Sequence, residues 1–127
     1  MPSAESVGVA GRAALALVLA LVLGACGGDE DDPVARGEAI ARDVGCIACH
    51  DAGTTTRIGP GWADTWGEEV PLEGGGTAVV DEAYLRRSVT DPTAEVREGF
   101  PPSMPRVPLA DEEIDDVTAY LRHLAGG

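Results

Sequence analysis

Two thiols and an imidazole lie together in one short stretch of the chain. Residues 46–50 read Cys-Ile-Ala-Cys-His, so the cysteines are three positions apart and the histidine directly follows the second. This spacing is typical of covalent haem attachment. On one turn of backbone the two sulfurs reach two vinyl groups on one porphyrin edge, and the adjacent histidine faces the iron. The motif therefore predicts one haem c per chain, attached through Cys46 and Cys49 and ligated axially by His50.

A Cys-x-x-Cys pair also occurs in zinc sites and in redox disulfides. A structural zinc site needs four ligands. The only other histidine is His123, and the only other cysteine, Cys26, follows an apolar leader, so the sequence lacks a full set. A redox pair of the thioredoxin type would need alternating strands and helices around it, and that pattern is missing. The surrounding residues therefore favour haem attachment.

One methionine is well placed to fill the second axial position of a haem iron. Apart from the initiator, the chain has a single methionine, Met104, in the stretch Gly-Phe-Pro-Pro-Ser-Met-Pro at residues 99–105. The prolines restrict the backbone, so the loop can hold the thioether in place at low entropic cost. The alternative is that Met104 only fills a gap in the core. We expect it to be the sixth ligand, and a His/Met pair raises the reduction potential.

Ligation by His50 and Met104 would occupy both axial positions, and this determines the predicted function. A substrate could reach the iron only by displacing Met104, so the site would pass single electrons. We therefore interpret the chain as an electron carrier, not an enzyme, with no catalytic residues. The alternative is a haem-based peroxidase or gas-binding sensor with a labile sixth ligand. Such a protein would need distal acid–base residues, and the sequence has no distal histidine or arginine motif.

Three segments have the periodicity and end signals of helices that could surround a haem. The first is expected over 33–45, where Asp32 can serve as the N-cap. The second is expected over 81–90, opened by an aspartate, and glycines at 74–76 predict a loop before it. The pattern predicts an all-α fold of about four helices wrapped around one haem c. The third helix is expected over 111–124, with a buried stripe of Ile114, Val117, Tyr120, Leu121 and Leu124.

Several short motifs outside the pentapeptide add to this pattern. They are Gly37, Ile58-Gly59-Pro60, Asp81-Glu82-Ala83-Tyr84-Leu85, Ser88, Asp91-Pro92, Glu98-Gly99-Phe100, Met104-Pro105 and Tyr120-Leu121. With these residues, 36–124 resembles a class I monohaem cytochrome c. Within that class it is most similar to the cytochrome c domain of subunit II in bacterial oxidases of the caa3 type. The copper-binding domain of such a subunit is missing from this sequence, so we expect a free-standing cytochrome.

The resemblance implies roles for two further positions. Pro60 matches the residue whose carbonyl accepts a hydrogen bond from the other nitrogen of the haem histidine, although Gly-Pro alone could also be a plain turn. Gly37 matches the glycine at which the last helix crosses the first closely. The aromatic residue usually found four positions later is Ala41 here. This difference suggests either a looser crossing or compensation by Tyr120 and Leu124.

The two tryptophans, Trp62 and Trp66, are candidates for the lining of the haem pocket. Aromatic residues make up only 4% of the chain, so these two large apolar side chains are expected to be used where most area is buried. One indole could donate to a haem propionate, and we favour Trp66. Arg86 and Arg87 could also reach a propionate, but solvated helix charges are the favoured interpretation. His123 lies off the buried stripe and is expected at the surface.

The N-terminal segment is typical of an export signal. Residues 13–25 form an unbroken small and apolar run after Arg12, and the run is shorter than the roughly 20 residues of a bilayer span. It ends in Leu-Gly-Ala-Cys, which resembles a bacterial lipobox. The resemblance implies cleavage before Cys26 and lipidation of that cysteine. The alternatives are an uncleaved anchor helix and a soluble secreted protein.

These signals predict three regions. Residues 1–25 are a signal peptide of the lipoprotein type, 26–32 an acidic flexible tether, and 33–127 the cytochrome c domain. Two or more acyl chains would hold the protein stably on a bilayer. We therefore expect a lipid-anchored protein on the extracytoplasmic face of the bacterial cell membrane, with redox partners on the same face. The oxidase resemblance makes a terminal oxidase a candidate acceptor.

Composition and charge are consistent with such a protein. The formal net charge is −13, and a nucleic-acid-binding face would need a basic footprint, so no nucleic acid partner is expected. A docking partner should present a neutral or basic patch. With few aromatic residues and 17 glycines, the chain has little core material for its size, which favours a large buried prosthetic group.

Overall fold

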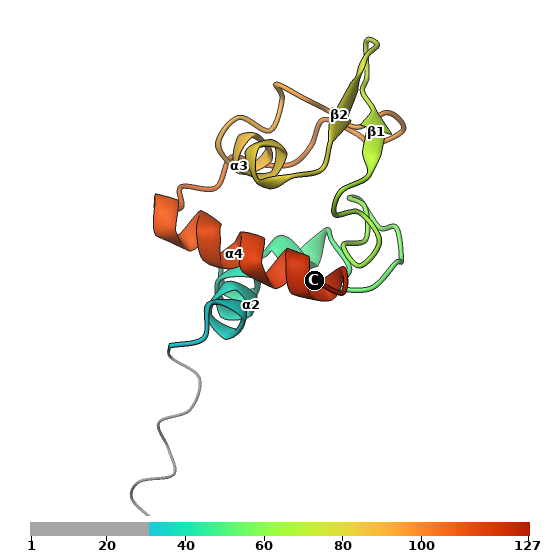
Figure 1. The fold of residues 1–127 in the computed structure, drawn as a ribbon. Helices are drawn as coiled ribbons and strands as arrows, with labels where there is room; N and C mark the ends of the chain where they lie inside the picture. Colours follow the sequence, from blue (N-terminus) through green and yellow to red (C-terminus); the bar gives the residue numbers. More distant parts are fainter. Residues whose placement is uncertain (1–30) are drawn as a thin grey trace, which may run out of the picture.

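The structure, a computed structural model, describes residues 31–127 (Figure 1). The expected signal peptide, Cys26 and most of the tether lie outside the described residues. Within 31–127, none of the helices has the length and hydropathy needed to cross a membrane. In chain order the elements are α2 (Pro33–Asp43), the 3-10 turn η1 (Cys46–Ala48), β1 (Glu69–Pro71), β2 (Thr77–Val79), α3 (Glu82–Thr90) and α4 (Asp111–Leu124).

The expectation of a purely helical fold with about four helices is not confirmed. The described residues contain three α-helices and one two-stranded antiparallel sheet, β1–β2. Glu69 pairs with Val79 and Pro71 with Thr77, so the loop expected at Gly74–Gly76 is the tip of a hairpin. All three glycines have positive φ, a conformation that lets this tip reverse tightly and bring the short flanking runs into register.

The helix ends largely follow the predicted caps. The Asp32 carboxylate accepts a hydrogen bond from Val34 N at 2.9 Å, and the Asp81 carboxylate accepts one from Tyr84 N at 2.8 Å. The first helix ends at Asp43 instead of Gly45, because Gly45 has φ 83° and turns the chain out of the helix. The predicted bounds of the last helix are confirmed.

The crossing of α2 and α4 forms one side of the molecule (Figure 1). A Cβ atom added at Gly37 would lie 2.0 Å from the Asp116 carbonyl oxygen and 2.9 Å from Tyr120 Cβ, so the backbones approach closely. The guanidinium of Arg36 bonds both carboxylate oxygens of Asp116 at 2.8 Å beside this point. The crossing is therefore tight, as expected from Gly37.

The main core cluster lies beside this crossing. Ala41 is completely buried and packs with Tyr120 and Leu121, while Leu124 covers the cluster from its edge. The missing aromatic side chain at position 41 is thus compensated by residues of α4, and the crossing is not looser. The full cluster is Ala41, Trp62, Val117, Tyr120 and Leu121.

Candidate functional site

A sharp turn after α2 presents the Cys-x-x-Cys-His motif. Gly45 leaves the helix in a left-handed conformation, the 3-10 turn η1 follows, and His50 N donates to the Cys46 carbonyl at 3.0 Å. The thiols of Cys46 and Cys49 are free and half-buried, and both line a cavity with His50. Burial raises the pKa of the Cys46 thiol. The turn thus brings two thiols and an imidazole to one wall of the cavity.

The His50 ring is held in one orientation. Its Nδ1 lies 2.9 Å from the Pro60 carbonyl oxygen, and the Trp62 ring stacks on it with centroids 5.1 Å apart. A Cβ at Gly59 would lie 2.4 Å from Cε1 of the ring, so only glycine leaves room there. Burial lowers the pKa of His50, partly opposed by the bond to Pro60. A neutral imidazole that donates through Nδ1 keeps Nε2 as a metal ligand.

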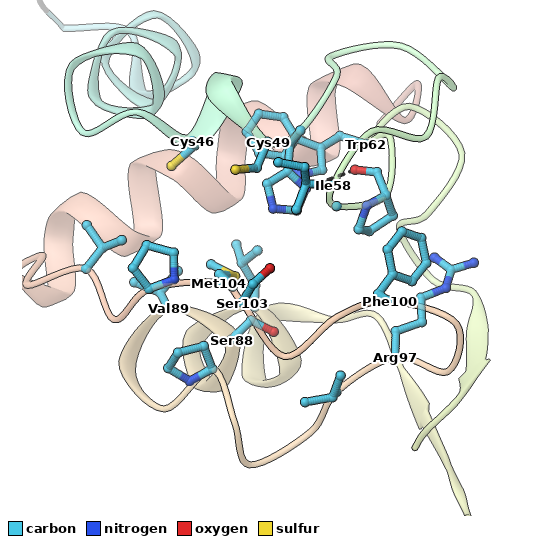
Figure 2. A pocket seen from close by; sticks show the side chains of 18 of the residues that line it. Cys46, Cys49, Ile58, Trp62, Ser88, Val89, Arg97, Phe100, Ser103 and Met104 are labelled. Carbon is cyan, nitrogen blue, oxygen red and sulfur yellow. Dashed lines mark hydrogen bonds between the residues drawn. The ribbon is translucent and has the colours of Figure 1, made fainter.

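Met104 lies across the cavity from this wall. Figure 2 shows its side chain facing the side that carries Cys46 and Cys49. Two hydrogen bonds hold the Met104 loop: Ser103 N donates to the Pro101 carbonyl at 2.8 Å within the loop, and Val107 N donates to the Val89 carbonyl of α3 at 3.2 Å. A thioether and an imidazole therefore occupy opposite walls.

The space between these walls is mostly apolar. Side chains from α3, α4 and the segment before Met104 close it, and the chain folds around it so that residues far apart in sequence share one lining. Such a surface suits a large, flat, apolar group better than a hydrated ion. The apolar lining includes Val80, Leu85, Val89, Phe100, Val117 and Leu121.

The donor set fits a haem c. Cys46 and Cys49 would form the thioethers, and His50 and Met104 would ligate the iron, which when bound supplies one-electron redox chemistry. The hydrogen bond to Pro60 already has the form of the bond that orients a ligating histidine. The zinc alternative finds no support in residues 31–127, where no group of three or more His, Cys, Asp or Glu side chains could hold a metal ion.

The two tryptophans lie in different places. Trp62 lines the cavity and contacts His50 and Tyr120. Trp66 is not among the lining residues; its ring lies under the Arg122 guanidinium, 5.4 Å from centroid to Cζ. The scarcity of aromatic residues predicted that both tryptophans would be buried. It gave no information on which of the two side chains lies in the cavity.

Of the charged residues considered for the site, Arg86, Arg87 and His123 do not line the cavity, whereas Arg97 does. Arg86 bonds Asp111 and Asp115, and Arg87 bonds Glu95, so both form ion pairs as helix charges. His123 is exposed. Sequence reasoning missed Arg97, which does line the cavity. It lies outside every helix, so helical periodicity gave no signal for it.

Comparisons with known proteins agree with this geometry. Among solved structures, cytochrome cH from Methylobacterium extorquens superposes with a TM-score of 0.54 at 24% identity, covering 71% of this chain and 97% of that one. At this identity the likeness supports the fold alone. No curated protein matches significantly. The family model described as cytochrome c matches residues 34–125, which is most of the sequence. The chain therefore belongs to the cytochrome c family, whose members bind haem c covalently and transfer electrons.

Proposed function

We propose that this protein carries single electrons on one haem c that His50 and Met104 ligate axially. The observation that supports this most is the position of Met104, across the cavity from Cys46 and Cys49 (Figure 2). His50, the next residue after Cys49, lines the same cavity. A thioether held on a proline-rich loop gives the iron a soft sixth ligand, which stabilises the reduced state. With both axial positions filled, no site remains for a substrate.

The substitution Met104→Ala tests this ligation. The variant should keep its covalent haem, because both cysteines remain, but its spectrum should become high-spin or ligand-binding and its potential should fall. Carbon monoxide should bind the reduced variant avidly and the wild type poorly. Ser103→Ala, at the neighbouring cavity-lining position, is the control and should behave as wild type.

Two outcomes would contradict the proposal. An unchanged spectrum and potential in Met104→Ala would remove Met104 from the coordination sphere. Avid carbon monoxide binding by the wild type at neutral pH would instead favour the alternative function, a peroxidase or gas sensor with a labile sixth ligand.

We further propose that the protein is exported and anchored by lipid on Cys26 to the extracytoplasmic face of the cell membrane. The support is the apolar run that ends in Leu-Gly-Ala-Cys and the acidic stretch after it. Replacing the cysteine, Cys26→Ser, should release the cytochrome from washed membranes into the soluble fraction. Retention of this variant on the membrane would favour an uncleaved anchor helix.

The proposed partners are redox proteins on the same membrane face, with a terminal oxidase as candidate acceptor. The net charge of −13 favours a partner with a neutral or basic contact patch, met in a brief encounter. The rate of reduction or oxidation by host membranes should then fall as ionic strength rises, since salt screens such attraction. A rate that increases with salt would contradict a basic partner.

A further inference from the structure

Arg97 is the one guanidinium on the cavity wall within residues 31–127. Its side chain is 26% exposed, and an arginine carries five N–H donors and a charge that it does not lose. The carboxylate on the same lining, Glu95, is bonded to Arg87 at 2.7 Å. Burial raises the pKa of Tyr84 and the charge of Arg97 opposes that rise, so the guanidinium acts on a group that lines the cavity.

The guanidinium of Arg97 makes no hydrogen bond to the part of the chain that the structure describes. Its closest carboxylate is that of Glu68, with Nη2 and Oε2 3.9 Å apart, which is beyond hydrogen-bonding distance. Its donors therefore remain available to a group in the cavity. By contrast, carboxylates accept hydrogen bonds from the guanidinium groups of Arg36, Arg42, Arg57, Arg86 and Arg87.

The position of Arg97 is fixed by its backbone and by an aromatic ring. The backbone pairs with Leu72 in an antiparallel bridge beside β1, and the guanidinium lies 5.7 Å from the centroid of the Phe100 ring. Figure 2 shows Arg97 and Phe100 at the end of the cavity away from Cys46 and Cys49. A cation is thus held in place opposite the attachment cysteines.

We propose that Arg97 donates to a propionate of the haem and thereby raises its reduction potential. The inference rests on the proposed function. Haem carries its propionates on the edge opposite the vinyl groups, so attachment through Cys46 and Cys49 directs the carboxylates toward Arg97. A carboxylate beside an apolar cavity needs a paired charge. When the guanidinium supplies that charge, the carboxylate stabilises the ferric iron less.

The test compares substitutions of Arg97 in the holoprotein by potentiometric titration. Arg97→Gln should shift the ratio of ferric to ferrous haem at a fixed ambient potential about tenfold toward ferric, which is about 59 mV for a one-electron couple. Arg97→Lys keeps the charge, so its ratio of ferric to ferrous haem should stay close to that of the wild type. Arg106→Gln removes an exposed arginine that does not line the cavity, and should change the ratio much less because solvent screens it.

Several results would overturn the role of Arg97. These are a wild-type ratio in Arg97→Gln, an equal shift in Arg106→Gln, or a full shift in Arg97→Lys. If Arg97→Gln does not accumulate as holoprotein, Arg97→Met keeps the length of the side chain over Phe100 and should show the same shift. Unchanged potentials with an intact low-spin spectrum would overturn this inference alone. A wild-type protein without covalent haem would overturn the proposed function itself.

Discussion

Replacing Gly37 by alanine tests how closely α2 and α4 cross. Inside a helix, alanine is favoured over glycine by about 0.8–1 kcal/mol, so helix propensity alone predicts that Gly37→Ala stabilises the protein. The added Cβ, however, would lie 2.0 Å from the Asp116 carbonyl oxygen and 2.5 Å from its carbon. These atoms belong to the backbone of another helix, so no side-chain rotation can relieve the contact.

The clash should outweigh the propensity gain. Carbon atoms reach their optimal separation near 3.5–4.0 Å, so the helices must move apart by about 1 Å or more. Overpacking of this kind costs about 1–3 kcal/mol and occasionally more, and a backbone contact belongs at the upper end. The separation would also loosen Tyr120, whose Cβ lies 2.9 Å from the added atom. We expect a net loss of about 2 kcal/mol in the free energy of unfolding.

Thermal unfolding of the holoprotein, followed by circular dichroism, measures this loss. For a domain of this size, 2 kcal/mol lowers Tm by about 8–16 °C. The control is Ala39→Gly, at an exposed position of the same helix, which should cost only the propensity difference of about 1 kcal/mol. A Gly37→Ala protein as stable as the wild type, or more stable, would refute the close crossing.

Two other substitutions test the histidine support and the interhelical ion pair. Gly59→Ala would place Cβ 2.4 Å from the His50 ring, so less low-spin covalent haem should form, as measured by absorption and by mass spectrometry of denatured protein; a wild-type yield would contradict this. The hydrogen bond from Arg36 lowers the pKa of Asp116. The ion pair therefore stabilises the folded state above the ordinary carboxyl pKa, and this stabilisation is lost as pH falls through the lowered pKa of Asp116. Asp116→Asn should flatten this part of the curve of stability against pH in acid unfolding, and an unchanged curve would argue against the ion pair.

Local signals predicted the helices, while the sheet was missed. The carboxylates of Asp32 and Asp81 act on backbone N–H groups two or three residues away, so sequence alone locates both helix starts. The hairpin depends on pairing between Glu69–Pro71 and Thr77–Val79. These runs are too short to show a clear alternation of apolar and polar residues. The glycines at 74–76 predicted a loop there, but gave no information on what the loop connects.

The cavity was predicted through its sulfur and imidazole groups and only partly through its walls, since Trp62 was expected in the lining and lies there, whereas Arg97 was missed. Types and spacing mark Cys46, Cys49 and His50, because attachment chemistry needs them within one turn. The backbone of Arg97, which lines the cavity, pairs with that of Leu72, a contact that depends on tertiary structure. Trp66 lies under Arg122 for the same kind of reason. Chemistry that acts within one turn can be read from sequence, whereas these contacts between segments far apart in the chain cannot.

The core and the cavity share residues, and this explains how a small set of buried apolar side chains supports the fold. Val117 and Leu121 of α4 pack in the core cluster and also line the cavity, whose other wall includes Val89 of α3. Apolar burial contributes roughly 25 cal/mol per Å², so a large apolar group between these walls would stabilise α3 and α4 together. Because thioethers to Cys46 and Cys49 cannot dissociate, that contribution would be permanent. The haem that Cys46 and Cys49 would hold for electron transfer would therefore also complete the core.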